Sequence, residues 1–380
     1  MKYSINQPNI SDLEKKYALD VLDKGWLSAG GQHTKAFENI FAKYLDIKYA
    51  IAVQSGTAAL HLALKASNIC PGDKVILPNY SCGASISSVV QCGAIPVVID
   101  VELDTYGLKL ESLENAIQKY KPKALQLVHA YGFPAKNTKK IVEICKNNNI
   151  ILIEDSSEAL GASINGQKIG SLGDIGTFSI RSEKMIGVGE GGVVVTNNNS
   201  LFDKMLKLAS RSAPFRSTES PFWEKYFYDG EGYNYRLPHL LGAVARGQIE
   251  RFPELLKEKK RVGKTFRKIF GKSSMWKLQK IEKETESVFW LNSILFHNIH
   301  KSIIRELGNN LMSKGIEVRS GFWPLSDMAA FNSQIFGSQN NGHFIYDNLL
   351  VLPSNGLLKE KDIELFYQTI CEFISKKGIK

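Results

Sequence analysis

The chain has 380 residues, of which 43% are hydrophobic and 23% are charged, and its formal net charge is +10 at pH 7. This length exceeds what one hydrophobic core usually serves, so we expect two domains of an ordinary soluble globular protein. No apolar run is long enough to span a membrane, and the N-terminal residues lack the apolar segment of a signal peptide, so we expect a cytoplasmic protein without membrane contact.

The cysteines and histidines argue against two kinds of site. The five cysteines form no CxxC pair, which argues against both a disulfide framework and a cysteine-rich zinc site. The seven histidines show no HExxH or similar spacing, so we expect no metal ion. The densest basic run, Lys257 to Arg261, follows a helical pattern without a nucleic-acid motif. We interpret it as a solvated helix face and expect no binding to nucleic acid.

The first predicted elements are a helix over 10–24 and another near 34–45. Ser11 followed by Glu14 predicts a capping box at the start of the first helix. The loop between the helices places Trp26 beside glycines, where it would line a ligand pocket or plug the edge of a domain. Both interpretations stay open.

From Tyr49 onward, short apolar runs alternate with helical patterns. The predicted strands cover 50–53, 74–77, 96–101, 124–129, 150–155, 176–180 and 193–196. The predicted helices lie near 58–66, 83–91, 110–119, 137–147 and 200–209. This alternation is typical of an α/β domain with a mostly parallel central sheet and helices on both faces.

The pattern changes after residue 200, where a polar and aromatic segment covers 210–233. A long irregular segment of this kind is usually functional or wraps a partner. A long helix broken by Pro253 is expected over 238–270. Strands near 287–297 and 348–352 and helices near 300–314 and 360–376 then predict a smaller α+β domain. We therefore divide the chain into a large domain, 1–245, and a small C-terminal domain, 246–380.

The turn from Gln54 to Thr57 joins the first predicted strand to a helix. Unpaired N–H groups at a helix N-terminus attract anions, so Gly56 and Thr57 form a candidate phosphate site. The alternative is that Ser55 simply caps the helix.

Several residues whose side chains could take part in catalysis lie between residues 150 and 196. Asp155 ends a buried strand, Ser179 lies near the end of the next, and Lys184 follows five residues later. Ligands of open α/β sheets bind outside the carboxyl ends of the strands, so these three side chains should meet at one crevice. A buried lysine beside a carboxylate is either a structural ion pair or an amine that forms a Schiff base with a carbonyl. An acid facing a pyridinium nitrogen and a phosphate cradle would complete a site for pyridoxal phosphate.

These residues stand in motifs that resemble the DegT/DnrJ/StrS family of sugar aminotransferases, which are fold type I pyridoxal-phosphate enzymes. The motifs occur in the family's order: SGTAALHLAL (55–64), GDKVILP (72–78), VHAYGFPA (128–135), EDSSEALGA (154–162), GSLGDIGTFS (170–179), EKMIGVGEGG (183–192) and GYNYR (232–236). Within the family, the chain is similar to enzymes that aminate carbon 4 of a nucleotide-linked 4-keto-6-deoxysugar.

The resemblance implies a role for each matching residue. Lys184 falls at the position of the Schiff-base lysine, and Asp155 at that of the acid that keeps the pyridine nitrogen protonated. The remaining cofactor positions are Gly56, Thr57 and Ser179 at the phosphate, Glu158 at the phenolic-oxygen side, and Asn234 reaching the phosphate from a neighbouring subunit. The resemblance thus implies a homodimer with shared active sites, and it places Ser28 and Arg236 toward the substrate.

Two places depart from the family pattern. Cys82 stands where the family usually has an aromatic residue stacked on the cofactor ring. Tyr80 would supply the ring from a shifted backbone, Cys82 would itself pack against the ring, or Cys82 would be an inert buried thiol. The residues before the lysine, Arg181 to Glu183, also differ from the commoner family patterns.

The resulting hypothesis is a pyridoxal-phosphate aminotransferase that moves an amino group from an amino acid, expected to be glutamate, to a nucleotide-linked keto sugar. The alternatives are a sugar 3-dehydratase of the same family and a cofactor-binding regulator without catalysis. Those dehydratases carry histidine in place of the Schiff-base lysine, so Lys184 argues against the first alternative. The sequence identifies neither the nucleotide base nor the sugar.

Overall fold

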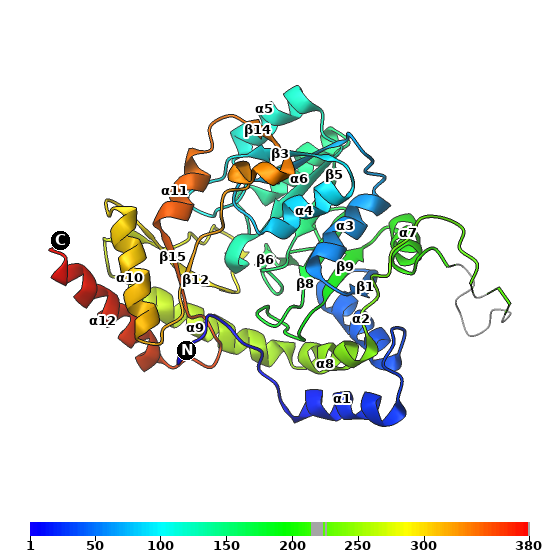
Figure 1. Cartoon of the computed structure of the whole chain (residues 1–380), viewed down its shortest axis with the longest axis horizontal. Helices are drawn as coiled ribbons and strands as arrows, with labels where there is room; N and C mark the ends of the chain where they lie inside the picture. Colours follow the sequence, from blue (N-terminus) through cyan, green and yellow to red (C-terminus); the bar gives the residue numbers. More distant parts are fainter. Residues whose placement is uncertain (214–222, 225, 379–380) are drawn as a thin grey trace.

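The computed structural model describes residues 1–213, 223–224 and 226–378. The described residues form three sheets, one of them a small three-stranded sheet. The two larger sheets lie along two consecutive helices, α8 (His239–Glu250) and α9 (Phe252–Phe270), as Figure 1 shows. The larger sheet has eight strands and the smaller one has four. Part of the predicted irregular segment at 210–233 falls outside the described residues.

The eight-stranded sheet has the order β1-β9-β8-β5-β4-β2-β3-β14. Its strands are β1 (Tyr49–Val53), β2 (Lys74–Pro78), β3 (Ile95–Ile99), β4 (Ala124–Val128), β5 (Ile151–Asp155), β8 (Ile175–Ser179), β9 (Gly192–Thr196) and β14 (Gln334–Phe336). All neighbours from β8 to β14 pair in parallel, whereas β9 is antiparallel to both β8 and β1. The predicted α/β class with a mostly parallel sheet is confirmed.

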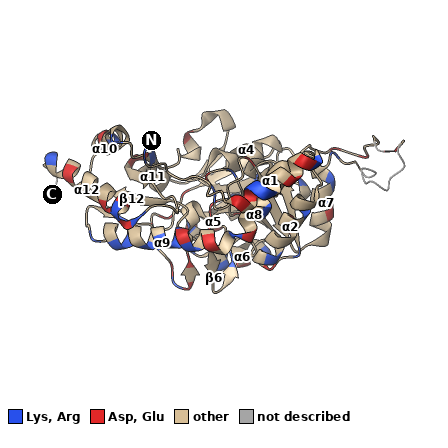
Figure 2. Cartoon of the chain, turned by 90° about the horizontal axis from the view of Figure 1, so that it is seen from below, with Lys and Arg blue, Asp and Glu red and all other residues tan. Residues whose placement is uncertain are grey.

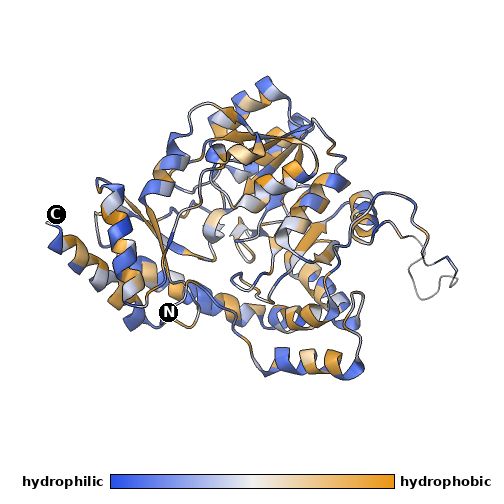
Figure 3. Cartoon of the chain, viewed as in Figure 1, coloured by the Kyte–Doolittle hydropathy of each residue, from blue (hydrophilic) through white to orange (hydrophobic). Residues whose placement is uncertain are grey.

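Alternate residues along the strands face different helical layers. In β2, Val75 and Leu77 belong to a core with α3 (Gly56–Ala66), α4 (Gly83–Gln91) and α7 (Asn199–Ala209). The residue between them, Ile76, belongs to the opposite core with α5 (Leu110–Tyr120) and α6 (Thr138–Asn147). The strands are accordingly apolar between two helical layers (Figure 3), as expected for a parallel sheet buried on both faces.

The four-stranded sheet is antiparallel and has the order β10-β12-β15-β13. Its strands are β10 (Trp276–Lys277), β12 (Asn292–Phe296), β15 (Leu349–Leu352) and β13 (Arg319–Ser320). It packs with α9, α10 (Lys301–Ser313) and α12 (Glu360–Lys376) around one apolar core. The division of the chain at 245 and 246 stays a prediction, and β14 and α11 (Asn340–Asn348) lie beyond it.

The buried carboxylate of Glu154 shapes the loop that leads into β8. Its Oε1 accepts hydrogen bonds from the backbone N–H groups of Leu172 and Gly173 at 2.6 and 2.7 Å, and Oε2 accepts from Gly170 at 3.1 Å. Since successive strand residues point to opposite faces, Glu154 holds this loop while its neighbour Asp155 is free to face elsewhere.

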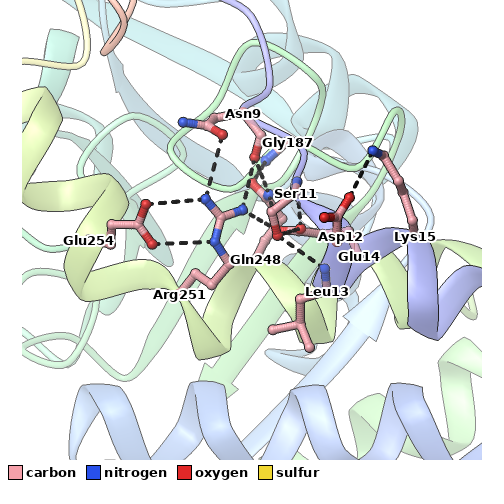
Figure 4. A network of polar contacts seen from close by, with 10 residues as sticks. All are labelled: Asn9, Ser11, Asp12, Leu13, Glu14, Lys15, Gly187, Gln248, Arg251 and Glu254. Carbon is pink, nitrogen blue, oxygen red and sulfur yellow. Dashed lines mark hydrogen bonds and ion pairs between the residues drawn. The ribbon is translucent and has the colours of Figure 1, made fainter.

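At the N-terminus, α1 (Asp12–Lys24) packs against α8, and α2 (Gln32–Leu45) packs there too. Ser11 and Glu14 form the predicted capping box. Glu14 is buried and accepts hydrogen bonds from Arg251 at 2.8 Å and from Gln248 at 2.6 Å (Figure 4). Because the Gln248 amide oxygen accepts from the backbone N–H of Gly187 at 3.4 Å, this network reaches the loop after Lys184.

The predicted long helix over 238–270 is two helices that break at Arg251, with Pro253 in the first turn of α9. Proline is tolerated there because its missing N–H would have had no helical partner. The basic run on α9 pairs with acids: Lys260 lies 2.8 Å from Glu286 and Lys268 lies 3.1 Å from Glu360. Figure 2 shows Lys and Arg interspersed with Asp and Glu. Lys257 and Arg261 are exposed, as predicted for a solvated helix face, whereas Lys259 is buried and departs from that prediction.

The predicted strand near 287–297 begins only at Asn292. The backbone N–H groups of Val288 and Leu291 donate to the carbonyls of Gly132 and Tyr131 instead, so this segment pairs with a turn of the larger sheet. Gly132 adopts φ +90°, and a Cβ there would lie 2.7 Å from the backbone nitrogen of Trp290. A residue without a side chain is therefore required at this contact.

Among the described residues, no helix is both long and apolar enough to cross a membrane. Within the same residues, no group of three or more His, Cys, Asp or Glu is arranged to hold a metal ion.

Candidate active site

A cavity of about 430 Å³ opens at the carboxyl ends of the parallel strands, between the two sheets. Seven of the predicted site residues line it: Gly56, Thr57, Cys82, Asp155, Glu158, Ser179 and Lys184. They come from the ends of β5 and β8, the first turns of α3 and α4, and the loop after β8. The crevice predicted from the strand ends is therefore present.

Lys184 and Glu158 form a buried ion pair inside the cavity. Lys184 Nζ donates to Glu158 Oε1 at 3.3 Å, and only 14% and 7% of the two side chains are exposed. Glu158 Oε2 accepts from the backbone N–H of Tyr131 at 2.8 Å. Burial raises the pKa of Glu158, and the positive charge of Lys184 partly counteracts that rise.

Asp155 lies at the carboxyl end of β5 and is 7% exposed. The backbone N–H of Ser157 donates to its Oδ1 at 3.2 Å, and the Ser85 hydroxyl donates to its Oδ2 at 3.2 Å. Two hydrogen bonds from separate elements thus fix the plane of this carboxylate.

The first turn of α3 lies at the cavity, where the anion cradle is predicted. Ser55 caps the helix by accepting from Ala58 N–H at 3.0 Å, so the capping alternative is confirmed, and phosphate binding stays a prediction. Gly56 and Thr57 follow with N–H groups that have no partner within the helix. A Cβ on Gly56 would lie 3.0 Å from Cβ of Ser179. Glycine therefore lets α3 begin directly against the end of β8.

Cys82 is exposed in the cavity at the N-cap of α4, so the reading of an inert buried thiol is wrong. Tyr80 is fully buried and its hydroxyl lies 2.8 Å from that of Tyr131. It is not among the residues lining the cavity, so Tyr80 does not supply a stacking ring. Phe322 and Trp290 do line the cavity.

Three predicted residues lie outside the cavity lining: Ser28, Asn234 and Arg236. Ser28 and Asn234 are exposed, and Asn234 Oδ1 accepts from Arg211 at 3.2 Å. Arg236 forms an isolated bridge with Val53, next to the turn that leads into α3. One chain alone therefore does not bring these three residues into the crevice.

Two cavity residues from the C-terminal half were missed in the sequence. The indole N–H of Trp290 donates to the carbonyl of Glu183 at 2.6 Å. Arg319, on edge strand β13, donates to both carboxylate oxygens of Glu183 at 2.9 and 3.1 Å. This pairing lowers the pKa of Glu183, with burial opposing it. Neither residue lies in a recognisable motif, so no sequence signal marked them.

Comparison with known proteins identifies the family of this chain. Residues 8–371 match the DegT/DnrJ/EryC1/StrS aminotransferase family. The chain belongs to this family. It is 34% identical to the GDP-perosamine synthase of Escherichia coli O157:H7, covering 99% of this chain and 100% of that protein. The similarity to this synthase extends over the whole chain, and the chain is an enzyme of the family.

Solved structures of the family share the fold. The aminotransferase TlmJ from Streptoalloteichus hindustanus superimposes with a TM-score of 0.90 at 22% identity, covering 99% of this chain and 100% of that one. The E. coli GDP-4-keto-6-deoxy-D-mannose-3-dehydratase with bound hydrated PLP gives a TM-score of 0.88 at 25% identity, covering 97% and 99%. The predicted fold type I architecture is confirmed.

The cavity of this aminotransferase-family chain fits pyridoxal phosphate, the cofactor of the family. It holds a carboxylate at a strand end for a pyridinium nitrogen, a lysine amine for a carbonyl carbon, and N–H and hydroxyl groups for a phosphate. Gly56, Thr57 and Ser179 all line the cavity, so the groups expected to hold the phosphate can be reached from it.

Proposed function

We propose that this enzyme transfers an amino group from an amino acid to a nucleotide-linked 4-keto-6-deoxysugar. The observation that carries the proposal is the arrangement of Lys184, Glu158 and Asp155 around one cavity, within a chain 34% identical to a GDP-perosamine synthase over its whole length.

Each cavity residue has a role in the proposal. Lys184 is the amine that would hold the cofactor through its carbonyl carbon, with release of water, and its nitrogen would be the group that moves a proton at the substrate carbon. Glu158, 3.3 Å from that nitrogen, is placed to accept a proton when the ammonium becomes a nucleophilic amine. Asp155 would pair with the ring nitrogen, and Gly56, Thr57 and Ser179 would hold the phosphate. When bound, pyridoxal phosphate supplies an electron sink for the bonds broken at the amino carbon.

Two arginines at the cavity are candidate ligands for an anionic substrate. Arg181 and Arg319 both line it, where they pair with Glu190 and Glu183, and a guanidinium group can bind a phosphate beside a carboxylate. Relatives from three organisms, 33–35% identical, are named GDP-perosamine synthase. We infer a GDP-linked keto sugar as the acceptor, glutamate as the amino donor, and amination at carbon 4.

The first test is cofactor binding. Purified protein mixed with pyridoxal phosphate should become yellow, and borohydride should bleach the band and leave the cofactor covalently attached. Lys184→Ala should lose the covalent link, whereas Lys272→Ala, which changes an exposed lysine at the end of α9, should keep it. A wild-type protein that does not take up the cofactor would refute the proposal.

The second test identifies the reaction. The enzyme should be incubated with glutamate and with GDP-, UDP- and dTDP-linked 4-keto sugars, and the products should be examined by mass spectrometry. An amino sugar formed together with 2-oxoglutarate supports aminotransfer. A 3-deoxy product would favour the dehydratase alternative, and bound cofactor without any turnover would favour the regulator.

We further propose a homodimer whose subunits share active sites. Asn234 and Ser28 are exposed outside the cavity of their own chain, and the family resemblance places Asn234 at a neighbour's phosphate. Leu19, Leu22, Trp26 and Leu27 are 49–59% exposed around the end of α1, an apolar surface suited to a partner. Light scattering should give twice the 42.4 kDa chain mass.

Five free cysteines agree with a reducing cytoplasm as the working compartment.

A further inference from the structure

Two buried serines connect the start of α4 to the Asp155 carboxylate: Ser85, in the first turn, contacts Asp155, and Ser81, just before the helix, contacts Ser85. Ser85 is fully buried and Ser81 is 2% exposed. The Ser85 hydroxyl lies 3.2 Å from Asp155 Oδ2, and the hydroxyls of Ser81 and Ser85 lie 2.7 Å apart. No sequence motif marked either serine.

The direction of these hydrogen bonds follows from the number of protons. An ionised carboxylate accepts only, so Ser85 must donate its single hydroxyl proton to Asp155. The Ser85 oxygen then accepts from Ser81, which gives a directed chain from Ser81 through Ser85 to Asp155. Ser85 is the third residue of α4, so the carboxylate also lies by the helix N-terminus, where partial positive charge stabilises an anion.

A second pair of hydrogen bonds, at the Ser88 hydroxyl, lies one helical turn beyond Ser85 and reaches neither the Ser85 hydroxyl nor Asp155. The Ser88 hydroxyl donates to the Ser85 carbonyl at 2.8 Å and accepts from the Gln126 amide of β4 at 3.0 Å. Buried hydroxyl groups cost free energy unless they are hydrogen-bonded, so this polar cluster in an apolar layer is tightly determined. The cluster reaches the cavity through Asp155 and Ser81, both of which line it.

We propose that Ser85 is a positioning residue that orients the Asp155 carboxylate toward the ring nitrogen of the cofactor, with Ser81 orienting Ser85 in turn. The inference rests on the proposed cofactor role of Asp155. Ser157 N–H holds Oδ1 and Ser85 holds Oδ2, so the carboxylate plane is fixed before the cofactor arrives. The other charged side chains lining the cavity are Glu158, Arg181, Glu183, Lys184, Glu190 and Arg319.

The test compares Ser85→Ala with Ser88→Ala. Both changes remove one fully buried hydroxyl from α4, but Ser88 does not contact Asp155. Ser85→Ala should weaken the affinity for pyridoxal phosphate about 10-fold, the usual effect of losing a hydrogen bond to a charged group. Ser81→Ala should weaken it about 3-fold, and Ser88→Ala should leave it within about 2-fold.

A second readout is the pH midpoint of the visible absorption of the cofactor-loaded protein, which reports on the nitrogen contributed by Lys184. A poorly oriented Asp155 leaves less positive charge on the ring, so the midpoint should rise by about 0.3 pH unit or more in Ser85→Ala and not in Ser88→Ala. In the Asp155→Asn background, adding Ser85→Ala should change affinity by less than about 2-fold, because the effect acts through Asp155.

Wild-type affinity and midpoint in Ser85→Ala would overturn the inference while the proposed function stands. Equal effects of Ser85→Ala and Ser88→Ala would also overturn it, since the role would then be merely structural. A wild-type protein that binds no pyridoxal phosphate would instead refute the proposed function, and the inference with it.

Discussion

The ammonium nitrogen of Lys184 lies 3.6 Å from the ring centre of Trp290, and the indole N–H of the same tryptophan donates to the carbonyl of Glu183. One side chain therefore contacts both the lysine side chain and the backbone that precedes it. Since Trp290 comes from the segment that pairs with the Tyr131 turn, the C-terminal half of the chain helps to place the amine.

Replacing Trp290 should slow attachment of the cofactor. Trp290→Leu removes both contacts. The cation–π contact favours the ammonium form, so its loss alone would not slow the reaction. The variant also loses the packing and the hydrogen bond that place the amine, and because a misplaced nucleophile reacts slowly, we expect a rate at least about 10-fold lower. Trp290→Phe keeps a ring face and loses only the N–H donor, so its rate should fall about 3-fold. The growth of the visible band after mixing with pyridoxal phosphate measures these rates. Trp323→Leu, at a tryptophan that is 52% exposed, is the control and should react at the wild-type rate.

Cys82 should be open to thiol reagents, because it is exposed in the cavity, whereas Cys92 and Cys145 are buried. We expect the Cys82→Ser variant to have one rapidly labelled thiol fewer than the wild-type protein. Bound pyridoxal phosphate should protect Cys82 and leave the other exposed thiol, Cys70, reactive. Labelling of Cys82 that is equally fast with and without the cofactor would contradict its place in the site.

Lys259 should make stability depend on pH. It is 5% exposed and donates to the carbonyl of Ser354, and burial lowers its pKa to about 7 from 10.5. Below pH 7 both folded and unfolded chains carry the proton, and the full cost of burying the charge is present. Between pH 7 and 10.5 only the unfolded chain holds it, so stability rises with pH across this window.

Lys259→Met should remove that rise, which is on the order of 3–5 kcal/mol. Urea unfolding at several pH values between 6 and 10 measures it, with Lys257→Met on the exposed side of the same helix as the control. The control should keep the wild-type slope. A Lys259→Met slope equal to that of the wild type would show that the lysine is not held in its neutral form.

Glu14 should be essential for docking α1. Its side chain is 1% exposed and pairs with Arg251 at 2.8 Å, so Glu14→Ala leaves a partly buried guanidinium without this partner. We expect a loss of about 3 kcal/mol in the free energy of unfolding. Asp12→Ala removes an acid whose side chain is 98% exposed, and it should cost less than about 0.5 kcal/mol. Equal losses in both variants would contradict a role for burial.

Much of the large sheet and of its crevice could be predicted, because the signals are local. The capping box at Ser11 and the apolar runs that end at Asp155 and Ser179 depend on neighbours in sequence. Parallel strands bring their carboxyl ends to one edge, so Asp155, Ser179 and Lys184 could be expected to meet there.

The rest depends on contacts between distant segments. The hairpin of β6 (Ser163–Ile164) and β7 (Gln167–Lys168) has strands too short to leave a pattern. Trp290 and Arg319 reach the cavity only through the packing of the small sheet, which no local periodicity specifies. The same holds for the pairing of residues 288–291 with the turn at Tyr131, which looked in sequence like the start of a strand.

Strand β14 has a consequence for how the chain can fold. It is contributed by residues 334–336 yet forms the outer edge of the large sheet, pairing in parallel with β3. Until these residues leave the ribosome, the row of N–H and C=O groups on β3, at Val97 to Ile99, has no partner on that side. An open apolar edge of this kind favours pairing between molecules. Nearly the whole chain must therefore be synthesised before the β3 edge of the large sheet is covered by β14.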